Sequence, residues 1–543
     1  MRRHSIFQVR RAAAAPARAA SDVPPAMGVL GRRAFLQSAA LAAAGTLAAS
    51  ACCSEALARR ALARPPRLSD DVAPAALPPL TGAALAARKK TLFGIGYETW
   101  FVPAVGGGGW GNAEATPVLG HYSSLDPKVI RQHAQWIHDA GFNFILIDWS
   151  NNLGGNWTNG VAEGIIGATM RLLEEYTRLK RRPKFVLLLG LDNGEVNTPQ
   201  FRLQMKRVEQ EILAKPAYAR LWQHFNGKPL LCIFPVPPAP YSNPDFTVRS
   251  MGAFHEITLN PGGAWSWVDR VAIVNGPMTP IFPFQGRSLR PWKAGPGWSP
   301  SQHPAMGVYA SHPAGPAGAL TSPPFTITER VITFNYSGTD YWVYAGLRFP
   351  DGKVPADQTI FVLRDASTGR VLRRAFPPGT PSFTMRQWDV VDLLGRRVVF
   401  EAHAASSTVL PYGGELGFGG LAFTRSEQIT ASVALGGNEA GGGGWLDWDA
   451  HLRCSGATLV RFLDGAFRYE PEVIFIQQWN EFASPDQYGV EGSNDIEPTV
   501  LRRLEGPHSD GWGYYYLDLV TKLVRQYRQG FRAPQVLLDT RYA

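Results

Sequence analysis

A tryptophan, an amide and a carboxylate end an apolar run late in the chain. The run Val473 to Ile476 is followed by two glutamines and then by Trp479, Asn480 and Glu481. Burying a charged group is costly unless the group is paired or hydrogen-bonded. Glu481 is therefore either a satisfied structural group at the end of a strand or a reactive group at the mouth of a site.

The same residue types follow other apolar runs. Those at predicted strand ends are Glu98, Trp100, Asp148, Trp149, Asn151, Asn152, Asp192, Asn193, Trp479, Asn480 and Glu481, and the next loop adds Glu491, Asp495 and Glu497. Carboxylates and amides bond sugar hydroxyls, and aromatic rings stack on the C–H faces of sugars. Hydrolysis of a glycosidic bond usually takes two carboxyl groups, one as the acid and one as base or nucleophile. The set therefore predicts a glycan-binding site.

Each of these residues also has a structural alternative, because polar side chains cap helices and connect loops. Asp126 before Pro127 is best interpreted as a helix cap. Asp192 and Asn193 fit either role equally well. Glu481 fits a functional role better, because it follows a buried strand and is flanked by Trp and Asn.

Apolar strands alternate with amphipathic helices from about residue 91. Strands are predicted at 92–100, 142–147, 185–191, 230–234, 428–435 and 473–479, and helices at 127–140, 161–180, 198–224, 456–467 and 511–528. Strands that are apolar throughout are typical of parallel sheets buried on both faces. No GxGxxG follows the first strand, which counts against a dinucleotide-binding fold. Polar residues gather after successive strands, as at the C-terminal face of a barrel. We therefore predict an α/β fold, a (β/α)8 barrel of the TIM type.

Between about residues 295 and 425 the pattern changes to short alternating runs separated by turns. This pattern predicts an antiparallel β-sandwich inserted between late barrel strands. The predicted domains are a signal region at 1–58, a linker at 59–90, the first part of the barrel at 91–294, the inserted sandwich at 295–425 and the last part of the barrel at 426–543.

The net charge of +10 is concentrated at the start of the chain. Residues 1–67 hold eleven arginines, no lysine and two acids, so that the remainder is close to neutral. A basic surface for nucleic acid is therefore not indicated, and no nucleic-acid partner is expected.

The stretch GRRAFLQ, with Arg32 and Arg33, resembles the twin-arginine export signal. The apolar stretch that follows, residues 38–51, is too short to span a membrane in the mature chain. The resemblance implies a periplasmic, secreted or cell-envelope-anchored protein. Two ways of processing stay open, namely a lipid anchor at Cys52 and cleavage near residues 51–58.

No cofactor and no metal are expected from the sequence. Beyond the leader only Cys232 and Cys454 remain, which form neither a disulfide framework nor a metal motif. Calcium could bind the acidic loop at 486–497, but the spacing of its acids does not fit an EF-hand.

Two parts of the chain resemble the glycoside hydrolase family 99-like proteins, which include the endo-α-mannosidases and relatives from O-antigen clusters. The first part is HYSSLDP at 121–127 with the following helix and the strand that ends in Asp148-Trp149. The second is the late strand, where the family has a motif like W-N-E-W-x-E-G-x-x-x-E-P. WNEF at 479–482 matches the start of that motif, and residues 491–498 resemble its end.

The resemblance implies an endo-acting hydrolase of O-glycosyl bonds on a barrel. Glu481 would assist attack by the substrate's own 2-hydroxyl, and Glu491 would be the acid/base. The chain departs from the family at position 484, which is serine, so that Glu491 comes ten residues after Glu481. An insertion at 483–490 would restore the correspondence, and Asp486 and Glu497 are the alternatives for the second carboxylate.

The sequence thus predicts a secreted glycoside hydrolase whose partner is a polysaccharide or complex glycan. The alternative is a non-catalytic glycan-binding or polysaccharide-assembly protein on a barrel scaffold, which the serine at position 484 favours. A polysaccharide lyase or a glycosyl transferase also stays open. The sugar, the linkage, the retaining or inverting outcome and the oligomeric state are not predicted.

Overall fold

The computed structural model describes a large part of the chain beyond residue 78. The described residues are 79–111, 113, 115–253, 263–269, 272–282, 291–295, 298–300, 308–311, 318–338, 360–377, 380–404, 417–433, 456–482, 495–502 and 512–538. They belong to the second of two compact units, Pro78–Ala543. The signal region 1–58, with Arg32, Arg33 and Cys52, lies outside the described residues, and so do Cys454, Asp486 and Glu491.

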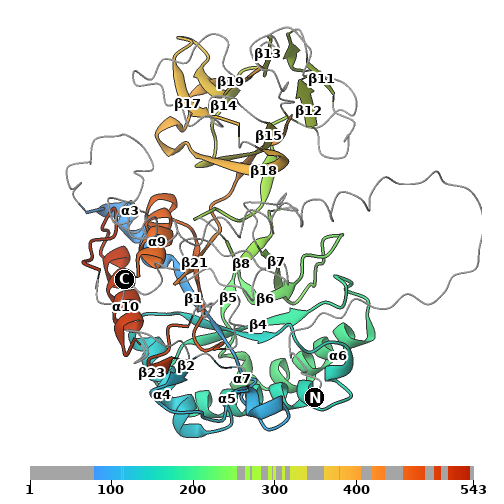
Figure 1. Ribbon diagram of the computed structural model, residues 1–543, viewed down its shortest axis with the longest axis vertical. Coiled ribbons are helices and arrows are strands. Elements are labelled where there is room, and N and C mark those ends of the chain that lie inside the picture. Colours follow the sequence, from blue (N-terminus) through green and yellow to red (C-terminus); the bar gives the residue numbers. More distant parts are fainter. Residues whose placement is uncertain are drawn as a thin grey trace, which may run out of the picture. The chain divides into compact units, whose positions relative to one another are not determined.

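Eight parallel strands form one sheet that nearly closes into a barrel (Figure 1). In sheet order they are β21 (Gln428–Ser432), β22 (Val473–Gln477), β1 (Leu92–Tyr97), β3 (Phe144–Trp149), β4 (Lys184–Gly190), β6 (Lys228–Phe234), β7 (Thr247–Ala253) and β8 (Trp265–Val268). A short strand, β5 (His224–Phe225), pairs antiparallel with β6. The order confirms the predicted parallel barrel to this extent, with first and last predicted strands paired as β1 and β22.

Side-chain hydrogen bonds join β8 and β21, the two end strands of the sheet. The Gln428 amide accepts from the Ser266 backbone N–H at 3.2 Å and donates to the Ser266 carbonyl at 3.0 Å, as a neighbouring peptide group would. The Thr430 hydroxyl donates to the same carbonyl at 2.7 Å. β8 and β21 are not paired by backbone hydrogen bonds in the strand order of the sheet. The side-chain bonds therefore satisfy buried backbone groups of Ser266 that would otherwise be unpaired.

One helix precedes the first barrel strand, and others follow later strands. They are α3 (Gly82–Lys90), α4 (Pro127–Asp139), α5 (Val161–Arg178), α6 (Pro199–Arg207) with a π-helical continuation (Val208–Leu213), α7 (Pro216–Ala219), α9 (Ala457–Tyr469) and α10 (Tyr515–Arg528), with short 3-10 turns at Gly106–Gly109, Gly154–Asn156 and Val391–Leu393. Asp126 caps α4, as predicted, because its side chain accepts from the Lys128 N–H at 2.8 Å. Residues 82–90, part of the predicted linker, form α3.

Antiparallel sheets occupy the segment between β8 and β21. One has the order β10 (Lys293–Ala294), β13 (Gly318–Thr321), β19 (Arg397–Ala404), β16 (Ile360–Asp365) and β17 (Val371–Ala375), with β14 (Phe325–Thr326) on β19. The other has the order β11 (Trp298–Pro300), β12 (Val308–Ser311), β20 (Gly417–Thr424), β15 (Val331–Gly338) and β18 (Thr380–Asp389), with β9 (Met278–Pro280) on β20. Away from both, β2 (Ala115–Pro117) pairs with β23 (Thr499–Arg502).

The two larger antiparallel sheets share an aromatic core. Phe400 of β19 stacks on Phe418 of β20 at 4.6 Å between ring centroids, and Phe334 of β15 meets Phe400 at 5.2 Å. All three side chains are at most 1% exposed. Burying rings of this size contributes strongly to stability, so the sheets hold together through side chains from both.

Alternate residues of the barrel strands fill the barrel interior. Phe144 and Leu146 of β3 belong to its buried apolar cluster, together with Val473 and Phe475 of β22. Gly94 of β1 makes room for this packing, because a Cβ there would lie 2.2 Å from the Phe144 ring. Side chains of a strand alternate between its two faces, so every second residue points into the barrel. The inward residues nearest the carboxyl ends of the strands therefore lie beyond this core.

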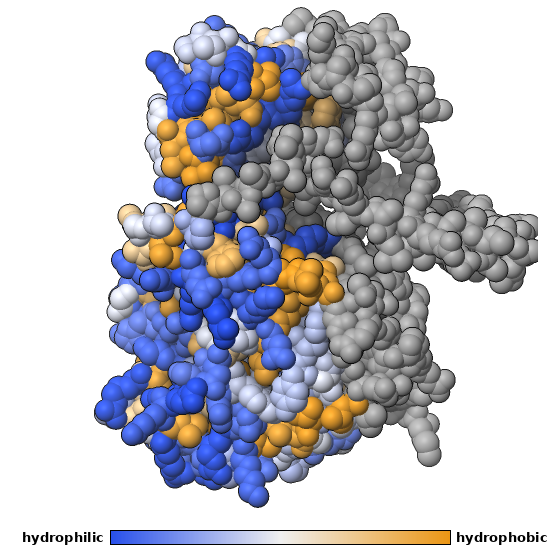
Figure 2. All heavy atoms as spheres, turned by 90° about the vertical axis from the view of Figure 1, so that its left-hand side faces the viewer, coloured by the Kyte–Doolittle hydropathy of each residue, from blue (hydrophilic) through white to orange (hydrophobic). Residues whose placement is uncertain are grey.

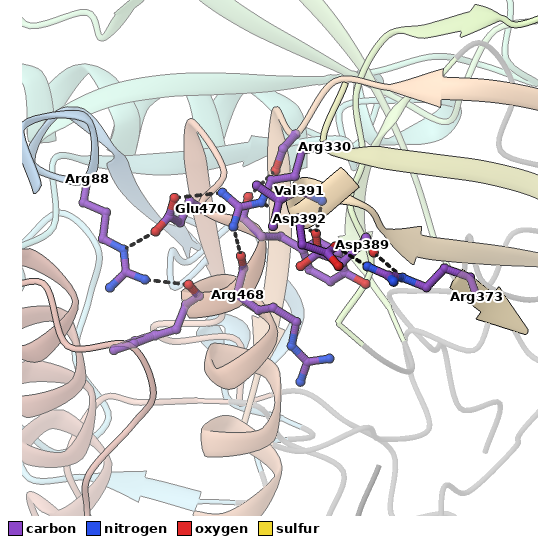
Figure 3. Close-up of polar contacts among 11 residues, drawn as sticks. Arg88, Arg330, Arg373, Asp389, Val391, Asp392, Arg468 and Glu470 are labelled. Atoms are coloured by element: carbon purple, nitrogen blue, oxygen red, sulfur yellow. Dashed lines mark hydrogen bonds and ion pairs between the residues drawn. The ribbon is translucent and has the colours of Figure 1, made fainter. Parts of the chain in front are cut away.

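A carboxylate near the start of β22 connects three parts of the chain (Figure 3). Glu470, which follows α9, accepts from Arg88 of α3 at 3.1 Å and from Arg330 at 2.8 Å. Arg330 precedes β15 and also donates to the Arg468 carbonyl. The segment of antiparallel sheets and the first described helix are thus bonded to the same side chain.

Hydrophilic side chains predominate on the face of the molecule in Figure 2, with smaller hydrophobic groups among them. The large apolar side chains that are exposed belong to separate elements, as Leu125, Leu203, Val391 and Tyr514 do. Single exposed apolar residues of this kind are normal on a folded protein. Among the described helices, none combines the length and the apolarity needed to cross a bilayer.

Candidate functional site

Glu98 lies directly after β1, and its side chain is only 1% exposed. The Gln478 amide donates to Glu98 Oε1 at 2.8 Å. The other oxygen, Oε2, is buried and has no hydrogen-bond partner among the described residues. Gly96 leaves space for this pair, because a Cβ at that position would lie 2.8 Å from Gln478 Oε1.

Asn480 holds the backbone of Glu98 in place. Its side-chain oxygen accepts from the Glu98 N–H at 2.8 Å, and its amide nitrogen donates to the Glu98 carbonyl at 3.1 Å. The same nitrogen lies 3.2 Å from the Tyr122 hydroxyl. A fully buried amide with these bonds fixes the end of β1 against the end of β22.

A buried polar network supports Asn480 from behind. The Tyr122 hydroxyl donates to Glu497 Oε2 at 2.7 Å, and Glu497 Oε1 lies 3.1 Å from His133 Nε2. His133 Nδ1 in turn lies 3.0 Å from the Tyr97 hydroxyl. Glu497 is fully buried and both of its oxygens are engaged, so its contacts are those of a structural carboxylate and count against its use as the second catalytic carboxylate.

Asp148, Glu481 and Asp495 complete an acidic group around Glu98. Asp148 continues the inward row of β3, is buried, and accepts from the Ser150 N–H at 2.5 Å. Glu481 is half-buried and comes three residues after Gln478. Asp495 accepts from the backbone N–H groups of Glu481 and of the next residue, Phe482, and thereby holds the turn that carries Glu481.

Burial and like charges shift the pKa values of two of these acids. Burial raises the pKa of Glu98 well above its usual value, and the nearby charges of Asp148, Glu481 and Asp495 raise it further, whereas the Gln478 bond opposes the shift. Burial raises the pKa of Asp148 to about 6, against the hydrogen bonds from Ser150. Neighbouring carboxyl groups with different pKa values are the requirement for acid–base chemistry.

The raised pKa of Asp148 has a measurable effect on stability. An acid whose pKa is higher in the folded state favours folding most at low pH, and this advantage falls as the pH rises from its unfolded pKa, near 4, to about 6. Asp148→Asn removes the titration. We therefore expect the free energy of unfolding of the variant, relative to wild type, to increase by about 2–3 kcal/mol between pH 4 and pH 7. Urea unfolding at the two pH values measures this difference, and a difference independent of pH would contradict the assignment.

Trp149 and Trp479, both predicted to bind ligand, point away from the barrel interior. The Trp149 indole donates to Thr169 of α5 at 2.9 Å, and the Trp479 ring packs 5.4 Å from His133 and 6.3 Å from Trp136 of α4. Both side chains are 0% exposed. Their rings therefore pack strands against helices, and this part of the predicted ligand set is corrected.

The remaining predicted residues lie in the loops after β1, β3 and β4. Trp100 is 5% exposed and meets Phe101 edge-on at 6.2 Å. The Asn151 carbonyl accepts from the Asn156 amide at 2.6 Å within the loop after β3. Asn152 is fully buried, and neither the nitrogen nor the oxygen of its side-chain amide has a hydrogen-bond partner among the described residues.

Asp192 and Asn193 form a turn after β4. Asp192 pairs with Glu195 across the turn, and Asn193 and Gly194 have φ values of 55° and 79°. Asn and Gly tolerate this left-handed region better than other residues. Asn193 is exposed, and the described contacts do not join these residues to the acidic group around Glu98.

Sequence reasoning did not assign a role to Gln478, Tyr122 or His133. Gln478 was visible only as one of two glutamines after the apolar run, and no spacing distinguishes it from Gln477. Tyr122 lies in the stretch that resembles the known family, but its bond to Glu497 spans 375 positions of the chain. His133 lies on a helix whose apolar pattern suggests a packing residue. Among the described residues, no group of three or more His, Cys, Asp and Glu side chains is arranged to hold a metal ion.

Comparisons with known proteins give distant structural likenesses. No family model and no curated protein matches the chain. The GH99 endo-α-mannosidase from Bacteroides thetaiotaomicron shares 13% identity over 81% of this chain and 98% of its own, with a TM-score of 0.38. A family 29 carbohydrate-binding module, CBM29-2, shares 12% identity over 27% of this chain and 84% of its own, with a TM-score of 0.17. Likenesses of this size show neither a family nor an activity, so the proposals below rest on the residues themselves.

Proposed function

We propose that the protein is a glycoside hydrolase that cleaves within a polysaccharide or complex glycan. The observation that carries this proposal is the convergence of Glu98, Asp148 and Glu481 at the carboxyl ends of β1, β3 and β22. These ends are where barrel enzymes hold their catalytic groups. The acids come from three different strand ends, and burial raises the pKa values of Glu98 and Asp148, as expected of a general acid.

Glu481 is the carboxylate that we assign to the reaction. It is half-buried, whereas Glu98 and Asp148 are buried, so it combines access to a ligand with a fixed backbone. Its backbone N–H donates to Asp495, which restricts the turn. By the resemblance Glu481 assists attack by the substrate's 2-hydroxyl, and Glu491, which lies outside the described residues, is the acid/base.

Release of reducing sugar from a panel of purified polysaccharides tests the proposal. New reducing ends in the middle of chains support an endo-acting hydrolase. An unsaturated product would instead indicate a lyase. Binding of a polysaccharide without any cleavage would favour the alternative, a glycan-binding or polysaccharide-assembly protein.

We further propose that the two antiparallel sheets form a β-sandwich that orients or binds glycan. The shared aromatic core of the sheets supports the sandwich arrangement. Its acid Asp365 supports a role outside catalysis, because its carboxylate accepts from Ser367 and Thr368 in a turn. The catalytic carboxylates are therefore assigned to the barrel alone.

We also propose that the protein is exported by the twin-arginine route. The motif around Arg32 and Arg33 supports this proposal. Replacing both residues by lysine should keep the protein in the cytoplasm, because the resemblance implies that the pair is read as a unit. Immunoblots of periplasmic and cytoplasmic fractions measure the outcome, and unchanged periplasmic yield would contradict it.

A further inference from the structure

We propose that Glu98 is an uncharged carboxylic acid in the working site and donates a hydrogen bond from Oε2 to a hydroxyl of an uncharged sugar. The inference rests on the proposed function, because it concerns the ligand of the same site. It assigns to Glu98 a chemical state and a partner, where the sequence assigned only a general binding role.

The hydrogen bonds of Glu98 determine which oxygen carries the proton. Oε1 already accepts the Gln478 N–H at 2.8 Å, so a proton on that oxygen would face another proton. Oε2 is buried and has no protein partner among the described residues. The proton therefore belongs on Oε2, where no described group already accepts it.

The surroundings of Glu98 keep it uncharged. Among the described residues, the charged groups that act on Glu98 are acids, namely Asp148 near the end of β3, Glu481 after β22, and Asp495. No described Lys, Arg or His forms an ion pair with Glu98. Neighbouring carboxyl groups in a buried place cannot all ionise, and the most buried of them retains its proton. The raised pKa of Glu98 agrees with this reading.

The backbone of Glu98 makes the donor rigid. Asn480 bonds both the N–H and the carbonyl of Glu98, and Gly96 lets Gln478 lie close against β1. A donor that is fixed before the ligand arrives loses little conformational entropy on binding. This fixed position favours recognition of one sugar oxygen over general attraction to a polar ligand.

The charges around Glu98 determine which sugars suit the site. Oε2 of Glu98 supplies a donor, and a sugar hydroxyl can accept from it. A sugar with a carboxylate or sulfate would instead bring negative charge toward Asp148 and Glu481. Glu98 and the acids around it therefore favour uncharged sugars over uronic acids.

The first test needs no ligand. Infrared difference spectra of wild type minus Glu98→Gln at pH 7 should show the C=O stretching band of one protonated carboxyl group. A carboxylate band in its place would overturn the proposal. Glu163→Gln, which changes an exposed acid of α5 in the same way, should lack the protonated band in its own difference spectrum.

The second test measures binding by calorimetry from pH 6 to pH 9, with a neutral α-mannan oligosaccharide and an oligogalacturonate as probes. The mannan affinity of wild type should stay constant while Glu98 holds its proton and should fall, by at most about tenfold per pH unit, above the pH at which Glu98 ionises. Glu98→Gln should stay within about threefold of its pH 6 value, because its amide still donates, and Glu98→Ala should bind about tenfold more weakly throughout. Glu163→Gln should follow wild type.

Two results of the binding test would overturn the proposal. Loss of mannan binding in Glu98→Gln at every pH would mean that the ligand needs a carboxylate acceptor. Tighter binding of the oligogalacturonate than of the mannan would mean that the site takes an acidic sugar. If wild type binds neither probe and cleaves no polysaccharide, the glycan function fails, while the infrared result still decides whether Glu98 carries the proton.

Discussion

Glu481→Gln should lower turnover on the polysaccharide that wild type cleaves by at least about a hundredfold, the usual scale for the loss of a positioned acid or base. The amide is nearly isosteric with the carboxylate, so the fold should be retained. Asn480 keeps its bonds to Glu98, and Asp495 keeps its bonds to the backbone of residues 481 and 482. Substrate affinity should therefore change much less than turnover.

A matched set of variants separates catalysis from structure. Glu491→Gln should behave like Glu481→Gln if the resemblance assigns it correctly, whereas Asp486→Asn should have little effect. Glu163→Gln removes an exposed acid on α5 and should retain wild-type turnover. Initial rates normalised to folded protein, together with melting curves, measure both effects for each variant.

A purely structural Glu481 gives a different result. Its replacement would then cost about 1–3 kcal/mol of stability, the scale of a buried hydrogen bond left unmade. The folded fraction would keep its rate per molecule. Near-normal turnover of Glu481→Gln in folded protein would thus contradict the assignment of Glu481 as a catalytic group of a hydrolase, and would favour a binding protein.

The barrel could be predicted from sequence because its signals are local. Apolar strands such as 144–149 and 473–477 are bounded by turn residues, and Asp126-Pro127 marks the start of a helix. The order of neighbouring strands follows from short, right-handed connections between them rather than from any single residue. The closure of the sheet could not be foreseen, because it depends on the Gln428 amide reaching a peptide group 162 positions away.

The positions of the candidate site residues were predicted in part, and the errors have more than one cause. Residue type and position at a strand end were enough to predict that Glu98, Asp148 and Glu481 lie close together. Neighbouring residues of a strand point to opposite faces, however, and Trp149 follows the inward Asp148. Counting by twos from Phe144 would have assigned Trp149 to the helix side. The same count does not reach Trp479, because the strand β22 ends at Gln477.

Contacts between distant segments explain the rest of what was missed. Asn480 was predicted to bind ligand, yet its bonds hold Glu98 and Tyr122. Glu497 was an alternative for the second carboxylate, yet Tyr122 and His133 occupy both of its oxygens. Such roles depend on tertiary neighbours, which residue type and spacing do not specify.

Glu470→Ala should lower the free energy of unfolding by about 3 kcal/mol, the lower end of the cost of breaking a buried ion pair. The reason is the guanidinium of Arg88, whose side chain is only 2% exposed. In the variant, the Arg88 guanidinium still contacts the Phe467 and Phe531 carbonyls and the Tyr527 ring. It no longer has a carboxylate partner to balance its charge. Burial already lowers the pKa of Arg88, which shows that this place disfavours the charge. Arg330, drawn with Arg88 and Glu470 in Figure 3, would lose the same partner.

Glu472 provides the matched control for this variant. It lies two residues farther along the chain and pairs with Arg425, and both side chains are more than a third exposed. Glu472→Ala should therefore cost at most about 1 kcal/mol. Urea unfolding at 25 °C measures both variants. Equal losses for the two variants would show that burial of Arg88 does not determine the effect.

The activity of Glu470→Ala then tests whether one end of the barrel contributes to stability alone while the other end carries the catalytic groups. Glu470 precedes the amino-terminal end of β22, whereas Glu98, Asp148 and Glu481 lie at the carboxyl ends of their strands. Because the strands are parallel, Glu470 and the three site acids lie at opposite ends of the barrel. In barrels of this type, residues at the amino-terminal end contribute to stability, and residues at the carboxyl end carry out catalysis. Turnover per folded molecule should therefore equal that of wild type despite the lost stability. A fall in turnover as large as that of Glu481→Gln would instead mean that the bond between Glu470 and Arg330, and with it the position of the antiparallel sheets, is part of the catalytic machinery.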